Sequence, residues 1–345
     1  MIDKEKWEFG KKNRIIQQKQ LRIGKLYRKK TANFINPKMI VQAALKSPEV
    51  VVKIPKRHGS SNGLQGILGN LDYISRNGHL DLENQDGELI SGKTEINSLI
   101  LDYAAMGIKE DSNRREALNV VLSMPPATPP DAVKDAVREF AKETFSHHQW
   151  VMVLHTDTDH PHCHLNILLQ GNHGKRLNPN LKMLQEWRER FAEKMMEQGV
   201  AATATKRQQR GKFNKSENNT IRHIQNRGAT AFVKQQQIDE IIDALTDNQR
   251  PKNPYLKEIL DSKNIVEEQY AHLAKALYKQ GFKNEASMIS QLRRSLQQSD
   301  TRSQMQKKYD TAVSQQSKPM PNWLEHENNK TSKTIAPVPK NKQLL

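Results

Sequence analysis

Two apolar runs in the middle of the chain are separated by a short polar loop. The runs cover residues 150–154 and 162–169, and the loop between them is rich in aspartate and threonine. This pattern predicts a β-hairpin. Because side chains alternate across a strand, we expect His162 and His164 on one face and Cys163, among apolar neighbours, facing the core.

Other segments before residue 200 show strand and helix patterns in turn. Strands are predicted at residues 49–55 and 117–124, with a second hairpin around residues 86–87. Helices are predicted at residues 36–45, 64–77, 94–106, 131–145 and 181–199. The short connections and the hairpins favour an α+β domain with a mainly antiparallel sheet flanked by helices.

The composition changes after residue 200, where a basic linker precedes helical patterns with thin apolar stripes. Helices are predicted at residues 220–245, 255–280 and 285–296. The predicted organisation is a basic N-terminal arm with a short helix (1–48), a core domain (49–205), a basic linker (206–217), a helical C-terminal region (218–300) and a disordered tail (301–345).

One tyrosine stands apart from the apolar stripe of its predicted helix. The stripe recurs at helical spacing and consists of Leu64, Ile67, Leu68, Leu71 and Ile74. Tyr73 lies on the opposite side of this helix, among small and polar residues such as Gly66 and Asn70. Burial in the core therefore does not explain Tyr73. It is either an ordinary surface tyrosine or a functional one.

The charge of the chain points to a polyanionic partner. The formal net charge is +17, and residues 1–60 alone hold 16 Lys/Arg against 4 Asp/Glu. Residues 10–32 are expected to form a basic helix, a segment that folds on DNA, or a disordered arm. The single cysteine excludes an intrachain disulfide and fits a reducing cytoplasm. The sequence contains neither a run long enough for membrane insertion nor a secretory signal.

Histidines are concentrated at the predicted central hairpin. Seven of the twelve histidines lie between His147 and His173. An antiparallel return brings His155 near His162 and His164, so three imidazoles are expected to bind a divalent cation with open coordination positions. The alternative is a set of solvated surface histidines.

A bound cation of this kind can polarise a phosphoryl oxygen. In a basic protein, the expected substrate is therefore a phosphodiester of a nucleic acid. The nucleophile is then either a metal-activated water or a side chain, for which Tyr73 is the candidate. An ordinary phenol is almost fully protonated at neutral pH. Tyr73 would therefore need a base, and the metal, Asp157 and Asp159 are the candidates.

The histidine segment HTDTDHPHCHLNI resembles the three-histidine motif of conjugative relaxases, the mobilisation nucleases of the HUH endonuclease superfamily, in the MobA-type group. Its motif residues match at His155, Asp157, His162 and His164, and Asn166 fits the trailing position. The likeness extends over about residues 49–212. His160 departs from the pattern of many relatives and leaves the ligand count open.

Two further motifs of this family have counterparts here. Tyr73, in LDYIS, fits the family's nucleophilic tyrosine on a helix upstream of the histidines. Ser123, in VLSMPP, fits a strand that ends in serine before a proline-containing loop.

The resemblance implies a relaxase-like palm fold and a strand-specific DNA nickase acting at an origin of transfer. Tyr73 would attack the scissile phosphate and become linked to the 5′ end, while Asp157 would orient a ligand histidine or help to deprotonate the phenol. Mg²⁺ or Mn²⁺ would be held by the three histidines. The expected DNA contacts are Ser123, Asn166, Lys175 and Arg176.

The implied partners are single-stranded DNA at the nick, relaxosome accessory proteins and a coupling protein, and the implied location is cytoplasmic, with transfer to a recipient cell left open. A rolling-circle replication initiator is the first alternative, but its histidine motif usually precedes its tyrosine. A DNA-binding protein with a structural metal is the second alternative, although a closed structural site usually has four ligands, often cysteines.

Overall fold

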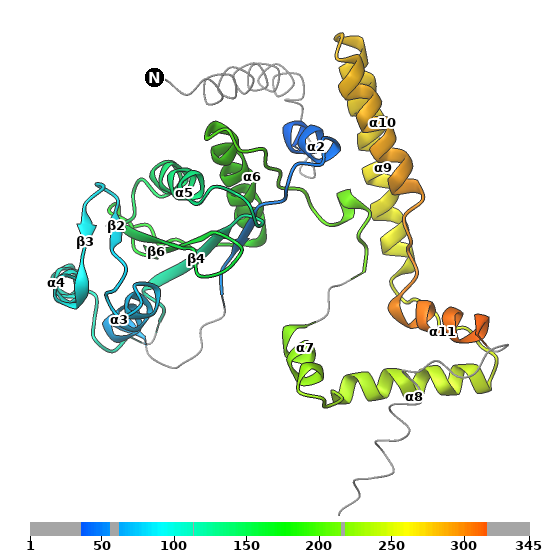
Figure 1. Ribbon diagram of the computed structural model, residues 1–345, viewed down its shortest axis with the longest axis horizontal. Helices are drawn as coiled ribbons and strands as arrows, with labels where there is room; N and C mark the ends of the chain where they lie inside the picture. The colour runs from blue at the N-terminus through cyan, green and yellow to red at the C-terminus, as the bar shows by residue number, and fades with distance from the viewer. Residues whose placement is uncertain (1–35, 56–61, 113, 215–217, 316–345) are drawn as a thin grey trace, which may run out of the picture. The chain divides into compact units, whose positions relative to one another are not determined.

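The computed structural model describes residues 36–55, 62–112, 114–214 and 218–315 (Figure 1). The predicted basic arm at residues 10–32 lies outside these residues, as does the part of the predicted tail from residue 316 onward. Contacts divide the chain into two units, one of residues 1–206 with 268–294 and the other of residues 207–267 with 295–345. The domain boundaries expected from the sequence stay a prediction.

Six strands form one antiparallel sheet in the order β1-β4-β6-β5-β2-β3. Their bounds are β1 Val51–Lys53, β2 Leu82–Asn84, β3 Leu89–Ile90, β4 Ala117–Ser123, β5 Trp150–His155 and β6 His162–Leu168. The predicted central hairpin is β5–β6, and β6 lies between β4 and β5. The α+β class with a mainly antiparallel sheet is therefore confirmed.

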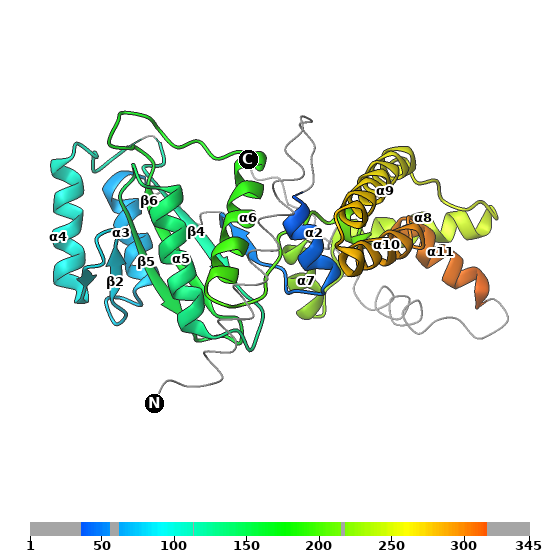
Figure 2. The same ribbon diagram turned by 90° about the horizontal axis from the view of Figure 1, so that it is seen from above.

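Helices cover both faces of this sheet (Figures 1 and 2). The helices of this part of the chain are α2 Pro37–Ala44, α3 Gly63–Ile74, α4 Gly92–Ala105, α5 Pro130–Thr144 and α6 Leu181–Glu197. Asn36 begins α2 as its N-cap, since its side chain accepts a hydrogen bond from the Lys38 N–H at 3.1 Å. Each of these helices had been predicted to within a few residues.

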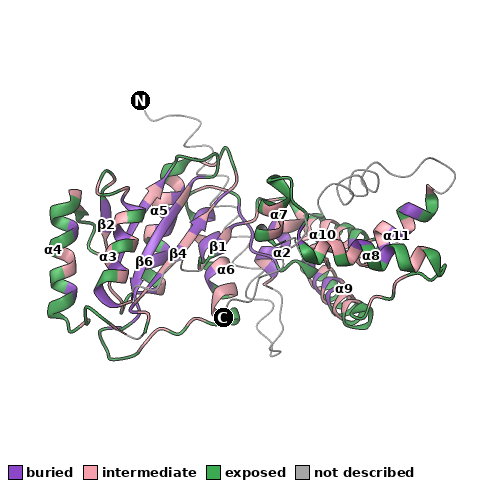
Figure 3. Ribbon diagram, turned by 90° about the horizontal axis from the view of Figure 1, so that it is seen from below, coloured by how far each residue is buried: buried purple, intermediate pink, exposed green. Residues whose placement is uncertain are grey.

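The alternation of side chains along β6 separates two cores. Cys163, Leu165 and Ile167 pack with α5 and α6, whereas Leu168 packs with α3 and α4 on the other face. Figure 3 shows β6 mostly buried and α4 largely exposed. The predicted orientation of Cys163 toward the core is confirmed, and the opposite face of β6 carries His162 and His164.

A buried carboxylate ties the sheet to α5. Glu83 on β2 accepts hydrogen bonds from Arg138 and forms an ion pair with Lys134 at 3.2 Å. Arg138 also pairs with Asp135. The hydrogen bonds from Arg138 lower the pKa of Glu83 below its ordinary value, although burial acts in the opposite direction.

The C-terminal helices differ from the sequence prediction in two places. Their bounds are α7 Asn219–Asn226, α8 Phe232–Thr246, α9 Leu256–Lys279, α10 Lys283–Gln297 and α11 Gln304–Ser314, preceded by a short 3-10 turn, η1 Gln208–Arg210. The single helix expected at residues 220–245 is interrupted after α7, because Gly228 adopts a positive φ of 76° and ends that helix.

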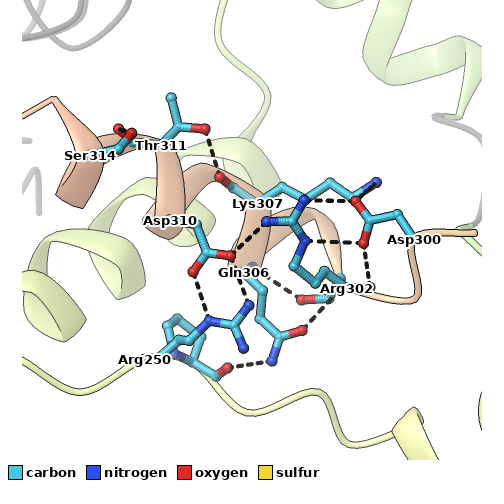
Figure 4. A network of polar contacts seen from close by, with 10 residues as sticks. Arg250, Asp300, Arg302, Gln306, Lys307, Asp310, Thr311 and Ser314 are labelled. Atoms are coloured by element: carbon cyan, nitrogen blue, oxygen red, sulfur yellow. Dashed lines mark hydrogen bonds and ion pairs between the residues drawn. The ribbon is translucent and has the colours of Figure 1, made fainter. Parts of the chain in front are cut away.

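The disorder expected from residue 301 onward is wrong for α11. Ser303 and Gln306 form a capping box that begins this helix. Figure 4 shows Asp310 of α11 accepting hydrogen bonds from Arg250 at 2.7 Å and from Arg302 at 2.9 Å, and Arg302 also pairs with Asp300. The few apolar residues of α11 do not predict a helix from the sequence. The capping box and the ion pairs of Asp310 stabilise it.

Among the described helices, none combines the length and the apolar character that crossing a bilayer requires.

Candidate active site

Three histidines meet where β5 ends and β6 begins. His155 and His162 are direct cross-strand partners, and His164 follows two residues later on the same face. The ring centroids are 5.2 Å apart for His155–His162, 4.6 Å for His155–His164 and 5.3 Å for His162–His164. One ring nitrogen from each lies within 4.8 Å of the others, a donor set that suits a divalent cation.

Each of these imidazoles has an oxygen partner for one of its ring nitrogens. His155 Nε2 lies 2.6 Å from the Ile74 carbonyl oxygen, His162 Nδ1 lies 3.0 Å from that of His160, and His164 Nδ1 lies 3.4 Å from Oδ1 of Asn119. A ring N–H that donates to such an oxygen fixes the tautomer. This leaves the lone pair of His155 on Nδ1, which lies 3.3 Å from Nη2 of Arg76, and the lone pair of His162 on Nε2. Nδ1 of His164 lies 3.3 Å from Nδ2 of Asn119 as well as 3.4 Å from its Oδ1, so this contact does not fix the His164 tautomer.

Burial keeps two of the three imidazoles neutral. It lowers the pKa of His155 below its ordinary value, and it lowers the pKa of His164 to about 4. Neighbouring positive charge from Arg76 acts in the same direction on both. These imidazoles are therefore uncharged at neutral pH and retain the lone pair that a metal ligand needs.

Helix α3 brings Tyr73 to this cluster. Its apolar stripe packs against the sheet, and Tyr73, off the stripe, keeps 60% of its surface exposed. The Tyr73 ring stands edge-on to His164, with 6.0 Å between centroids and 84° between planes. Asn166 on β6 donates a hydrogen bond to Asn70 on α3 at 2.6 Å, which joins the tyrosine helix to the histidine strand.

Arg76 is a member of this cluster that the sequence analysis did not single out. Its guanidinium carbon lies 5.6 Å from the centroid of the Tyr73 ring, and its Nη2 lies 3.3 Å from Nδ1 of His155 and donates to Asp157. The available signal was an arginine three residues after the tyrosine, at the predicted end of the helix. Sequence spacing alone does not show on which side such a turn residue lies.

Asp157 lies in the loop between β5 and β6, where it forms an ion pair with Arg76. Partial desolvation raises the pKa of Asp157, but the hydrogen bond and the charge of Arg76 outweigh it, so this pKa lies below its ordinary value. The carboxylate is therefore ionised at neutral pH and is a weak proton acceptor. His160, in the same loop, lies with its Nδ1 3.3 Å from the Met124 carbonyl oxygen and is not part of the three-histidine cluster.

The residues expected to contact DNA are found in three different settings. Ser123, at the end of β4, is the cross-strand partner of His162, and its hydroxyl donates to the Met124 carbonyl at 3.4 Å. Asn166 is buried and bonded to Asn70. Lys175 and Arg176 lie beyond the other end of β6.

Arg176 is also engaged by protein groups. Its Nη1 donates to Glu116 at 3.1 Å, and its Nη2 donates to the carbonyl of Arg115. The structure thus brings together Tyr73, Asp157 and the three histidines, with Ser123 beside them, and it separates Lys175 and Arg176 from that cluster.

Comparison with known proteins agrees with this geometry. The family model of the MobA/VirD2-like relaxase nuclease domain matches residues 73–200. The T-DNA border endonuclease VirD2 of Rhizobium radiobacter is 28% identical over 184 residues, which cover 47% of this chain and 43% of the relative. Its counterpart from Agrobacterium fabrum is 27% identical over 186 residues, covering 47% and 41%.

The VirD2 of Rhizobium rhizogenes is 27% identical over 188 residues, covering 48% of this chain and 42% of the relative. The chain thus spans less than half the length of the curated relatives it matches. The matched region contains Tyr73, Asp157 and all three histidines, and it covers β2 to β6 with α4, α5 and α6, whereas α2, β1 and most of α3 precede it. Residues 73–200 of this chain are therefore similar to the MobA/VirD2-like relaxase nuclease domain.

Proposed function

We propose that this chain is a metal-dependent DNA relaxase, which nicks one strand at an origin of transfer and later rejoins it. The observation that carries the proposal is the approach of the Tyr73 ring to His164, at 6.0 Å between centroids, beside three imidazoles on one face of the sheet. A nucleophile and a cation-binding set so close together suit transfer of a phosphoryl group to a side chain.

The reaction is a transesterification with no net change in the number of phosphoester bonds. The phenolic oxygen of Tyr73 forms a bond to phosphorus, the bond from phosphorus to the 3′ oxygen breaks, and that oxygen leaves with a proton as a free 3′-OH. The 5′ phosphate stays on Tyr73. The reverse attack by a 3′-OH restores the strand and releases the tyrosine, so no nucleotide cofactor is required.

His155, His162 and His164 would hold the metal, for which we propose Mg²⁺ or Mn²⁺. When bound, the cation would polarise a non-bridging phosphate oxygen and help to orient the phosphate. Neutral imidazoles add no negative charge to the site, so a bound cation keeps its full positive charge toward the substrate. Three protein ligands leave coordination positions open, unlike a closed structural site.

The charge state of Asp157 favours a positioning role over proton transfer. Its carboxylate is paired with Arg76, and its lowered pKa makes it a poor acceptor for the phenolic proton. Asp159 and His160 in the same loop are the other candidates for moving that proton. Asp157 instead holds Arg76 next to Tyr73 and His155.

The substrate we propose is single-stranded DNA at the nick, in line with the net charge of +17. Ser123, paired with His162 on the histidine face, is the proposed contact nearest the scissile phosphate. Lys175 and Arg176 would contact DNA only away from the nick. Relaxosome accessory proteins and a coupling protein are the proposed protein partners.

The decisive experiment compares wild type with Tyr73→Phe on a supercoiled plasmid that carries the cognate origin of transfer. We expect the wild type, with Mg²⁺ or Mn²⁺, to form a detergent-resistant protein–DNA adduct and Tyr73→Phe to form none. Tyr255→Phe is the matched control, because Tyr255 is 69% exposed and lies in the C-terminal helical part. It should form the adduct as the wild type does.

Two outcomes would count against the proposal in different ways. An adduct formed by Tyr73→Phe would show that another residue is the nucleophile. A wild type that never forms an adduct with either metal would overturn the relaxase proposal itself.

A further inference from the structure

The turn that follows α3 has an unusual backbone. Arg76, Asn77 and Gly78 have φ values of 55°, 59° and 83°. Gly78 is required there, since a Cβ on it would lie 2.8 Å from the Lys93 backbone nitrogen. Asn is tolerated at positive φ, but an arginine is rare at such a position.

Strained backbone of this kind persists where the surrounding structure holds it, and it clusters at functional sites. Arg76 is held by the ion pair with Asp157 and by its contact with His155. Its side chain is half-buried and bridges the end of α3 to the hairpin loop. The turn thus carries a guanidinium to the space between Tyr73 and the three histidines.

Two nitrogens of the Arg76 guanidinium are not used by contacts to the described residues. Both of its hydrogen-bonding contacts to protein run through Nη2, to His155 and to Asp157. Among the described residues, Nε and Nη1 have no hydrogen-bond partner. The Nε–H lies on the edge shared with Nη2, and Nη1 lies on the other side, next to Cδ. Each of these two nitrogens can therefore donate a single hydrogen bond to a phosphate oxygen.

We propose that Arg76 is a catalytic residue that binds a non-bridging oxygen of the scissile DNA phosphodiester during attack by Tyr73. This inference rests on the proposed relaxase function. The phosphodiester carries one negative charge, and attack by the phenolic oxygen adds negative charge to the oxygens on phosphorus. A fixed guanidinium therefore binds the transition state more tightly than the ground state. Asp157 is the positioning residue for Arg76.

The test uses single-turnover cleavage of a single-stranded oligonucleotide that contains the nick site, with three variants. Arg76→Gly removes the guanidinium and suits the positive φ, so it preserves the fold. Arg76→Lys retains the charge without the planar guanidinium. Asn77→Gly is the matched control, because it relieves the same backbone strain one residue away and leaves the guanidinium in place.

We expect Arg76→Gly to lower the cleavage rate about 100-fold, with binding of an uncleavable oligonucleotide weakened less than about tenfold. Arg76→Lys should recover part of the rate. Added guanidinium ion at millimolar concentration should accelerate Arg76→Gly but not the wild type. A purely structural arginine would show neither recovery. Asn77→Gly should cleave at the wild-type rate.

The outcomes separate this inference from the proposed function. If the wild type forms the Tyr73 adduct and Arg76→Gly cleaves within about threefold of it, Arg76 does not bind the reacting phosphate, and the relaxase function stands. The same conclusion follows if Arg76→Gly loses oligonucleotide binding and cleavage to the same extent and guanidinium restores neither. If the wild type itself forms no adduct, the proposed function fails, and this inference fails with it.

Discussion

Asn166 of β6 donates a hydrogen bond to the side chain of Asn70 of α3, at 2.6 Å, across 96 positions of the sequence. Tyr73 lies about one helical turn after Asn70, and His164 lies two residues before Asn166. The bond therefore fixes the register of the tyrosine helix against the histidine strand. A site whose two halves come from separate elements depends on such a contact.

Replacement of Asn70 by alanine should loosen this register. The buried amide of Asn166 would lose its partner, which destabilises the fold by about 1 to 3 kcal/mol. We expect urea denaturation to show this loss and single-turnover nicking to slow, although neither asparagine is proposed to touch the scissile phosphate. Gln65→Ala is the control on the same helix, because Gln65 makes an exposed hydrogen bond to Glu110. Equal stability of Asn70→Ala and wild type would contradict the prediction.

Metal binding should depend on His164 and not on His160. A ligand that binds only the folded state raises its stability by about 2.7 kcal/mol at a concentration of 100 times its dissociation constant. Thermal unfolding with increasing Mn²⁺ should show a rising midpoint for wild type and for His160→Ala, and a fixed midpoint for His164→Ala. The reverse pattern would place His160 in the ligand set instead.

Acid should weaken the fold through Glu83. The folded pKa of this carboxyl is lowered, so its contribution to stability is present above its ordinary pKa of 4.5 and is lost as pH falls through the folded value. Glu83→Gln should cost about 2 to 3 kcal/mol at neutral pH, because Arg138 and Lys134 lose a buried partner. The difference between the variant and the wild type should shrink below about pH 4.5.

A matched comparison for Glu83 is Glu143→Gln. Glu143 pairs with Lys194 but keeps 52% of its side chain exposed, so solvent screening limits the cost to less than about 1 kcal/mol. Denaturation curves measured from pH 3 to pH 7 would distinguish the two. If the difference in unfolding free energy between Glu83→Gln and wild type were the same at every pH, the charge of Glu83 would not contribute to stability.

The single cysteine should report on global unfolding. Cys163 is fully buried between α5 and the sheet, and burial raises the pKa of its thiol to about 12. We expect no reaction with a thiol reagent in the folded protein and labelling in urea that follows the unfolding curve. A cysteine introduced by Lys182→Cys, at a side chain that is 86% exposed, should react at once. Fast labelling of Cys163 in the absence of urea would show local opening of the sheet.

Those parts of the site that follow from periodicity could be predicted from the sequence. The two-residue alternation of β6 separates His162 and His164 from Cys163, and a direct cross-strand pair brings His155 to His162. The exposure of Tyr73 follows from the helical stripe that it does not share. Both patterns depend only on neighbouring residues in the sequence. The structure places the histidines and Cys163 on opposite faces of β6, as these patterns predict.

Contacts that depend on distant pairing could not be predicted in this way. The position of Arg76 depends on a left-handed turn and on Asp157, 81 residues later. The sequence does not show that Asn166 is buried and donates a hydrogen bond to Asn70 of α3, and its expected contact with DNA stays a prediction. Nor does it show that Arg176 donates to Glu116 beyond the end of β6 that lies away from the histidines, and its expected contact with DNA also stays a prediction.

The position of β6 in the sheet has a consequence for how the protein is made. Its two hydrogen-bonded neighbours, β4 and β5, are both synthesised before it. Without β6, the strands β1-β4 and β5-β2-β3 have no pairing that joins them into one sheet. β6 is the last strand to be synthesised, and it carries two of the three histidines. A translation product that ends before β6 would therefore lack both the complete sheet and the proposed metal site.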